Sequence, residues 1–346
     1  METDAMQAEP TLKFLFATRQ ALCALVVIVT LCSGLFATTT YAQTESDTVV
    51  VRRQDSQQTL KRRGTIVEWK GLSLTLNSNG REREIDNDEI VEVQTGWGQD
   101  YVEGVRELKQ GKTNQAVIKL QSALASESRP WAKRIIRSRL VDAFQTLEQP
   151  AAAVEQFLLI VREDPQTRFL HLAPLPWTGS SNALQSQAQQ WIQSREPLMQ
   201  LIGASWLLSG PQRQQAIKVL ESLARDIDAR IKNIAIAQLW RTRTTVNQRQ
   251  TEVWQGIIEK MPRSLRAGPY LVLADAQART GLTELAQINL MRIPILYPDQ
   301  QSLSAAALYR AANLMHNGGD TQRAQSLLNE LVTNYPQTIW AQQATQ

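Results

Sequence analysis

The stretch LADAQARTGLTELAQINLMRIPILYP, residues 273–298, is matched in pattern by AANLMHNGGDTQRAQSLLNELVTNYP, residues 311–336. Gly281 aligns with Gly319, Ala286 with Ala324, and the Tyr-Pro pair at 297–298 with the pair at 335–336, each 38 residues apart. Glycine permits a tight turn between two helices, a small alanine lets their backbones approach, and proline ends the second helix. The two stretches therefore predict successive helical hairpins.

This pattern resembles the tetratricopeptide repeat, a helical hairpin whose copies stack into a right-handed superhelix. Four further units place residues on the family's small, aromatic and proline positions. The first contains Gly104, Gly111, Ala116 and Ala123, and the second contains Phe144, Ala153, Phe157 and Pro165. The third contains Ala204, Ala216, Leu220 and Leu223, and the fourth contains Trp254 and ends at Met261-Pro262. The spacing exceeds the ~34 residues usual for the family, and the family's Trp-Leu-Gly run in the first helix is largely missing. A generic αα-hairpin solenoid therefore remains the alternative.

Helical periodicity begins after Gly98 and continues to the end of the chain. It predicts helices over 99–109, 113–126, 131–147, 150–162, 183–194, 197–209, 211–225, 229–243, 249–260, 266–279, 282–293, 302–317 and 320–333. The Pro- and Gly-rich segment 164–182 cannot continue a helix. We therefore expect N-terminal hairpins over 98–163, an inserted loop over 164–182, and C-terminal hairpins over 183–346.

A different pattern precedes the helices. Short alternating or β-branched runs between residues 64 and 97 are separated by Asn-Gly and Asp-Asn turns, which is the signal for β-hairpins. The segment predicts a small antiparallel β module similar in pattern to SH3-like or Sm-like barrels. Residues 43–63 are polar and predict a linker, with one β-prone run at 48–51.

The N-terminus resembles a secretory signal peptide. Residues 21–42 carry no charge, Lys13 and Arg19 precede them, and the apolar stretch ends on the small residue Ala42. We expect residues 1–42 to be a signal peptide cut after Ala42, which places the protein in the periplasm or cell envelope. The alternative is an uncleaved N-terminal membrane anchor, because about 20 apolar residues can span a bilayer.

The composition of the chain limits which catalytic and ligand-binding functions it can have. The 346 residues include 37 basic and 33 acidic side chains, only two His and two Cys, and both Cys lie within the expected signal peptide. No phosphate-binding glycine loop, metal-binding motif or nucleophile elbow is present. We therefore expect no enzyme activity, no metal, no cofactor and no nucleic-acid partner.

The resemblance to tetratricopeptide repeats implies that the first helix of each hairpin lines a concave face that binds peptides. It places a polar patch there, formed by Asp275, Arg279, Tyr309, Asn313 and His316. The carboxylate-binding pattern of Lys and Asn known in the family is not reproduced, since Leu271 and Asp275 occupy its positions. A solvent-facing terminal repeat is the alternative for this patch.

Trp177 differs from the other tryptophans because it lies in the proline-rich insertion. It would either anchor a partner or tuck under the loop as a hydrophobic pin.

Together these features predict a mainly α protein, a helical-hairpin solenoid behind a small β module. Its expected function is that of a protein-interaction scaffold in the cell envelope, binding a peptide or partner protein of unknown identity on the concave face. The alternative is a binder of an envelope polymer or of anionic lipid headgroups, through the β module and the basic residues before it, which would also suit proximity to a membrane.

Overall fold

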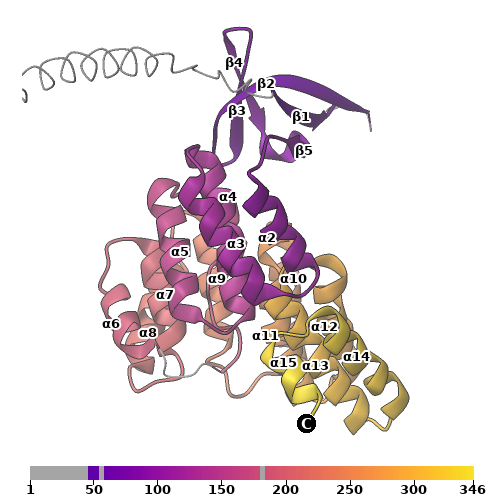
Figure 1. Cartoon of the computed structure of the whole chain (residues 1–346). Helices are drawn as coiled ribbons and strands as arrows, with labels where there is room; N and C mark the ends of the chain where they lie inside the picture. The colour runs from indigo at the N-terminus through magenta and orange to yellow at the C-terminus, as the bar shows by residue number, and fades with distance from the viewer. Residues whose placement is uncertain (1–45, 54–57, 180–183) are drawn as a thin grey trace, which may run out of the picture. The chain divides into compact units, whose positions relative to one another are not determined.

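The computed structural model describes residues 46–53, 58–179 and 184–346 (Figure 1). The expected signal peptide lies outside these residues. Within the described part of the chain, no helix is both long and apolar enough to cross a membrane.

The chain begins with a five-stranded antiparallel sheet. Its strands are β1 (Asp47–Arg52), β2 (Thr59–Lys70), β3 (Ser73–Ser78), β4 (Arg81–Asp86) and β5 (Ile90–Gln94), in the order β4-β3-β2-β1-β5. The long strand β2 pairs with β1 through its first half and with β3 through its second half, with a register shift between Ile66 and Glu68. A bulge of this kind bends a strand, so β2 joins the two halves of the sheet.

The sheet starts earlier than the sequence indicated. The segment 43–63, expected to be a polar linker, supplies β1 and the first part of β2. Val49 is fully buried, and it pairs with Arg62 on one side and Val93 on the other. The short β-branched run therefore becomes an inner strand because two distant segments pair with it.

Helices follow the sheet to the end of the chain, as the periodicity predicted. They are α2 (Gln99–Lys109), α3 (Thr113–Ser126), α4 (Pro130–Thr146), α5 (Pro150–Glu163), α6 (Gln185–Trp191), α7 (Pro197–Leu207), α8 (Arg213–Leu223), α9 (Ala229–Trp240), α10 (Gln248–Lys260), α11 (Ala267–Arg279), α12 (Thr283–Leu296), α13 (Gln301–Asn317), α14 (Thr321–Asn334) and α15 (Ile339–Ala344). Most successive helices pack against each other, with α5–α6 and α9–α10 as the exceptions, which confirms the fold class of a helical-hairpin solenoid behind a β module.

Four of the hairpins share one turn geometry. Gly111, Gly281 and Gly319 all have positive φ, and the amide of the residue after each glycine donates to the carbonyl five residues before that amide. This is a Schellman motif, which closes a helix C-terminus. Five residues after each glycine lies a buried alanine: Ala116, Ala286 and Ala324. In the fourth hairpin, α4–α5, Glu148 holds the turn position with φ 54°.

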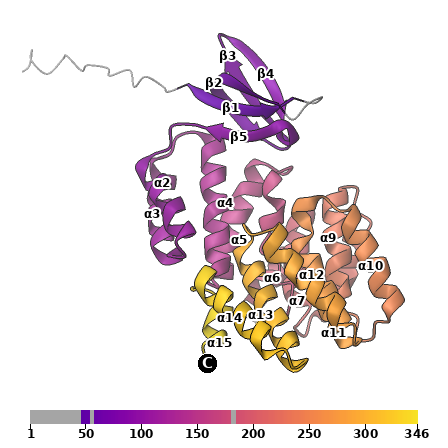
Figure 2. The same ribbon diagram turned by 90° about the vertical axis from the view of Figure 1, so that its right-hand side faces the viewer.

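The β module shares its core with the first helices. A single apolar cluster contains Val49, Ile66 and Leu74 of the sheet together with Trp131 and Leu140 of α4. The two parts lie side by side in Figure 2.

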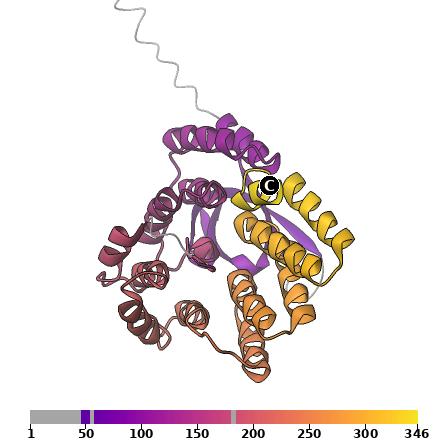
Figure 3. The same ribbon diagram turned by 90° about the horizontal axis from the view of Figure 1, so that it is seen from below.

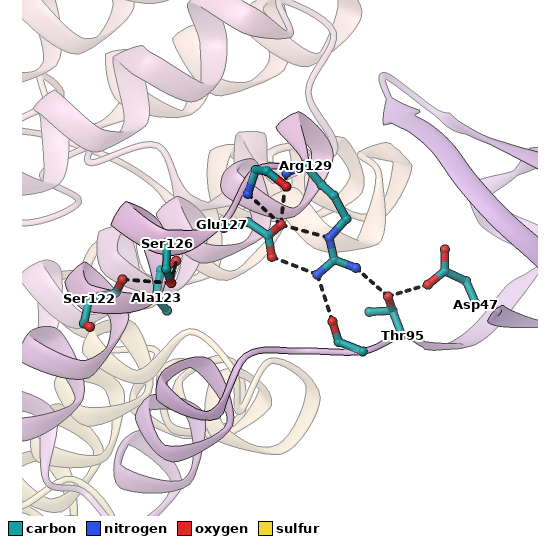
Figure 4. A network of polar contacts seen from close by, with 9 residues as sticks. Asp47, Thr95, Ser122, Ala123, Ser126, Glu127 and Arg129 are labelled. Carbon is teal, nitrogen blue, oxygen red and sulfur yellow. Dashed lines mark hydrogen bonds and ion pairs between the residues drawn. The ribbon is translucent and has the colours of Figure 1, made fainter. Parts of the chain in front are cut away.

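Polar contacts reinforce this junction. Buried Arg134 of α4 pairs with Glu68 and donates to the Trp69 carbonyl. Arg129, just before α4, donates to Glu127 and to the Thr95 hydroxyl, which in turn donates to Asp47 (Figure 4). The module is thereby fixed to the start of the solenoid.

The ends of the helical array meet. A Cβ on Gly111 would lie 2.8 Å from the Pro336 ring, and the Asn114 amide donates to the Gln337 side chain over 3.2 Å. Helices α4 and α13 are also in contact. Figure 3 shows α2 and α3 beside the C-terminal helices. An open solenoid makes contacts only between neighbouring units, so this array is closed by its terminal hairpins.

Candidate functional site

Residues 164–179, the part of the insertion that the structure describes, lie against helices that precede and follow them in the chain. It begins with the 3-10 helix η2 (Arg168–Leu172), and Leu170, Leu172, Ala173 and Leu175 are buried in the same cluster as α7 and α8. Its backbone is held by side chains of the array: the Trp206 indole N–H donates to the Pro174 carbonyl at 3.0 Å, and Arg241 donates to the Thr178 carbonyl at 2.8 Å. The described part of the insertion is therefore packed into the helical array.

Trp177 sits at the centre of these contacts. It is half-buried and packs against both major helical clusters, and a Cβ on Gly268 of α11 would lie only 2.0 Å from the Trp177 ring. The absence of a side chain at Gly268 makes room for the indole. This contact corresponds to the hydrophobic-pin interpretation of Trp177.

A cavity of about 300 Å³ opens beside the insertion. It is bounded by several elements, and its walls are rich in aromatic, proline and aliphatic residues. The lining residues are Gln145, Glu148, Pro150, Pro174, Leu175, Pro176, Trp177, Thr178, Gly179, Trp206, Leu271, Ser302, Leu303, Ala306 and Trp340. A cavity with apolar walls and a few polar groups is the usual form of a binding site.

A second cavity, of about 150 Å³, shares Trp177, Thr178 and Gly179 with the first. Its remaining lining residues are Leu208, Ser209, Arg213, Arg241, Val272, Asp275 and Arg279. We refer to it as the arginine pocket. Burial, and to a lesser extent the positive charge of Arg213, lower the pKa of Arg241 to about 10. Its one carboxylate, Asp275, forms an ion pair with Arg310 of α13.

Three of the six residues predicted from the sequence meet at the arginine pocket: Trp177, Asp275 and Arg279. Tyr309 is half-buried and packs on Trp340, with ring centroids 5.4 Å apart, so it supports a wall of the first cavity. Asn313 and His316 are exposed on α13 and line neither cavity.

Sequence reasoning missed Arg213 and Arg241. Arg213 is the first residue of α8 and Arg241 directly follows α9. Neither belongs to a motif, and only the packing of α8, α9 and the insertion brings them together. Trp206 and Trp340 line the first cavity, but no motif in the sequence marks them as binding residues.

A further cavity, of about 20 Å³, is lined by Asp142, His171 and Ser302 among others. Burial raises the pKa of Asp142 to about 7 and lowers that of His171. His171 Nδ1 lies 3.2 Å from the Arg168 carbonyl, and no hydrogen bond joins the three side chains in the part of the chain described. They therefore do not form the hydrogen-bonded arrangement of a nucleophile and its base. Nor do the described residues contain a group of three or more His, Cys, Asp or Glu suited to hold a metal ion.

The β module has a groove of its own, of about 540 Å³, between β1, β2 and β4. Four arginines line it, Arg52, Arg53, Arg62 and Arg83, against two glutamates, Glu84 and Glu89. The groove therefore carries a surplus of positive charge.

Comparison with known families supports the repeat. Residues 306–338 match a family model described as a tetratricopeptide repeat. The match covers most of α13, all of α14 and the turn before α15. No curated protein and no solved structure was found to match the chain. The class that fold and match define is thus an αα-hairpin solenoid with a tetratricopeptide-like repeat at its C-terminal end.

Proposed function

We propose that the protein is a non-enzymatic interaction scaffold that binds a peptide or partner protein beside the insertion, in the two adjoining cavities. The observation that carries this proposal is the cavity of about 300 Å³ with Trp177, Trp206 and Trp340 in its walls. Aromatic residues are enriched in protein–protein interfaces, where they often line or fill pockets. The tetratricopeptide match supports the same general role, because helical-repeat solenoids provide extended concave binding surfaces.

The test is to fill the cavity without disturbing the rest of the array. Ser302 lines the cavity and is partly accessible, whereas Ser326 is exposed on α14. We expect Ser302→Trp to lose the partner that the wild-type protein captures from extracts of its own cells, and Ser326→Trp to retain it. Equal capture by both variants would place the binding surface elsewhere.

We also propose that the protein is exported. The support is the uncharged stretch at 21–42 with its basic flank and small terminal residue. Mass spectrometry of the protein isolated from cell envelopes should find an N-terminus at Gln43, and a retained N-terminus would favour the membrane anchor.

A second candidate function is favoured by the groove of the β module. Its four arginines suit an anionic polymer or lipid headgroup. Binding there should weaken steeply with salt and with Arg52→Gln plus Arg62→Gln, and salt-independent binding would argue against it.

A further inference from the structure

The arginine pocket holds more positive charge than the protein itself neutralises. Arg213, Arg241 and Arg279 all line it. None of the three forms an ion pair with a carboxylate of the described residues, and the pocket's single acid, Asp275, is engaged by Arg310. Arg213 and Arg241 are partly withdrawn from water, and such charged groups are usually paired, so this surplus marks the pocket as suited to an anion.

The two inner arginines are held in place by neutral groups. Arg241 donates to the carbonyls of Ser205 and Thr178 and to the Gln238 side chain, and Arg213 donates to the carbonyls of Leu208 and Thr242. A guanidinium has more N–H groups than these bonds use. Carbonyl oxygens orient the guanidinium groups but leave their charge uncompensated, which is a preorganised arrangement for a carboxylate.

The pocket is accessible and small. Arg279 and Gly179 are exposed at its edge. Its volume of about 150 Å³ is half that of the adjoining cavity. The smaller compartment therefore suits a compact group such as a carboxylate, and the larger one suits a bulky side chain.

The adjoining cavity completes the site. It is twice as large, is lined by tryptophans, prolines and leucines, and shares the segment from Trp177 to Gly179 with the arginine pocket. A short peptide that follows this segment can place a carboxylate in one compartment and an apolar side chain in the other.

We propose that the arginine pocket and the adjoining cavity bind an acidic peptide of a partner protein, with a carboxylate on Arg213, Arg241 and Arg279 and a bulky apolar side chain between Trp177, Trp206 and Trp340. This proposal rests on the proposed scaffold function and names the chemistry of its ligand. The arginines stand at helix ends and beside the insertion, away from the groove positions that the repeat resemblance implies.

The experiment selects displayed random heptapeptides with free C-termini on the purified protein. We expect enriched peptides to combine a bulky apolar residue with a carboxylate, and synthetic copies to bind less tightly to Arg279→Gln by at least about tenfold, the value of one charge-assisted hydrogen bond. Arg213→Gln should have the same effect. The control is Arg225→Gln, which alters an exposed arginine just beyond α8 and should leave the affinity unchanged.

Variants of the enriched peptides show whether the bound carboxylate is the C-terminus or a side chain. Loss of binding on C-terminal amidation assigns it to a chain terminus, and loss on Glu→Gln or Asp→Asn exchange assigns it to a side chain. Failure to enrich any peptide, or equal affinity for wild type, Arg279→Gln and Arg213→Gln, would overturn the proposal. If enriched peptides bind wild type, Arg279→Gln and Arg213→Gln equally but lose binding to Ser302→Trp, the scaffold function stands and only the anionic ligand is wrong.

Discussion

Glu148 adopts a left-handed backbone conformation at the turn position that glycine holds in three other hairpins. Side chains with a Cβ pay about 1–2 kcal/mol for this conformation, and strain of this kind gathers at functional sites. Glu148 also lines the larger cavity, and partial burial raises the pKa of its carboxyl. The strain is therefore located at the proposed binding surface.

Replacing Glu148 by glycine should stabilise the protein by about 1 kcal/mol, because glycine adopts positive φ without strain. Glu148→Ala removes the same carboxylate but keeps a Cβ, so it should bring no comparable gain. Thermal unfolding of the two variants measures the difference. Equal melting temperatures would contradict the strained turn.

Asp142 gives the protein a specific pH dependence. Burial raises its folded-state pKa to about 7, with Arg139 acting in the opposite direction and Asp299 in the same one. The folded state then keeps a proton that the unfolded state loses near pH 4. The contribution to stability is therefore greatest at acidic pH and declines by up to about 4 kcal/mol as the pH rises from about 4 to above 7.

The variant Asp142→Asn should lack this decline. Partly buried His171 has a lowered pKa and acts in the opposite sense below about pH 6.5, and it does so in wild type and variant alike. Denaturant unfolding from pH 4 to 8 should show the variant gaining stability relative to wild type as the pH rises. The same change at exposed Asp88 is the control, and parallel curves for wild type and Asp142→Asn would refute the assignment.

At the scale of elements, the helices could be predicted because their signals are local. The expected ranges 99–109 and 113–126 coincide with α2 and α3, and Pro130 and Pro150 begin α4 and α5. Strand β1 could not be predicted with the same certainty, since it is defined by pairing with β2 and β5, which are distant in sequence. The same distinction between local and long-range information applies to the candidate site. Trp177, Asp275 and Arg279 could be singled out from the insertion and from the repeat alignment. Arg213 and Arg241 could not, because only tertiary packing brings them to the pocket.

The hairpin contact at Ala324 is a direct test of the repeat register. Ala324 is 3% exposed, and Ser326, two positions further along α14, is exposed. Ala324→Leu adds three heavy atoms to a filled contact and should cost about 1–3 kcal/mol, whereas Ser326→Leu should stay within about 0.5 kcal/mol of wild type. The reverse order in thermal unfolding would show that the register is wrong.

The position of the insertion depends on the close approach of Trp177 to Gly268. Gly268→Ala places a methyl group where the indole lies and should destabilise the protein by about 1–3 kcal/mol. Gly256→Ala in α10 meets nothing within 4 Å and should instead gain about 0.5–1 kcal/mol of stability.

A double variant provides the control. With Trp177→Ala also present, Gly268→Ala should lose most of its cost, because the two residues are coupled only through this contact. An unchanged cost of Gly268→Ala in that background would mean that the insertion does not pack on α11.

At the scale of the whole molecule, the described part of the insertion and the closed array together form the proposed binding surface. The turn after α2 meets the segment before α15, so the first and last hairpins support each other. The insertion lies among α7, α9 and α11 and contributes a wall to both cavities. We therefore expect a partner to bind beside the insertion, on a surface to which distant parts of the chain contribute.

Site-specific photo-crosslinking tests this claim most directly. Thr178 borders both cavities, and Thr333 is exposed on α14 away from them. A photoreactive amino acid placed at Thr178 should form a covalent adduct with a second protein in intact cells, and the adduct should disappear with Ser302→Trp. The same group at Thr333 should give no such adduct. Crosslinking from Thr333 but not from Thr178 would contradict the account.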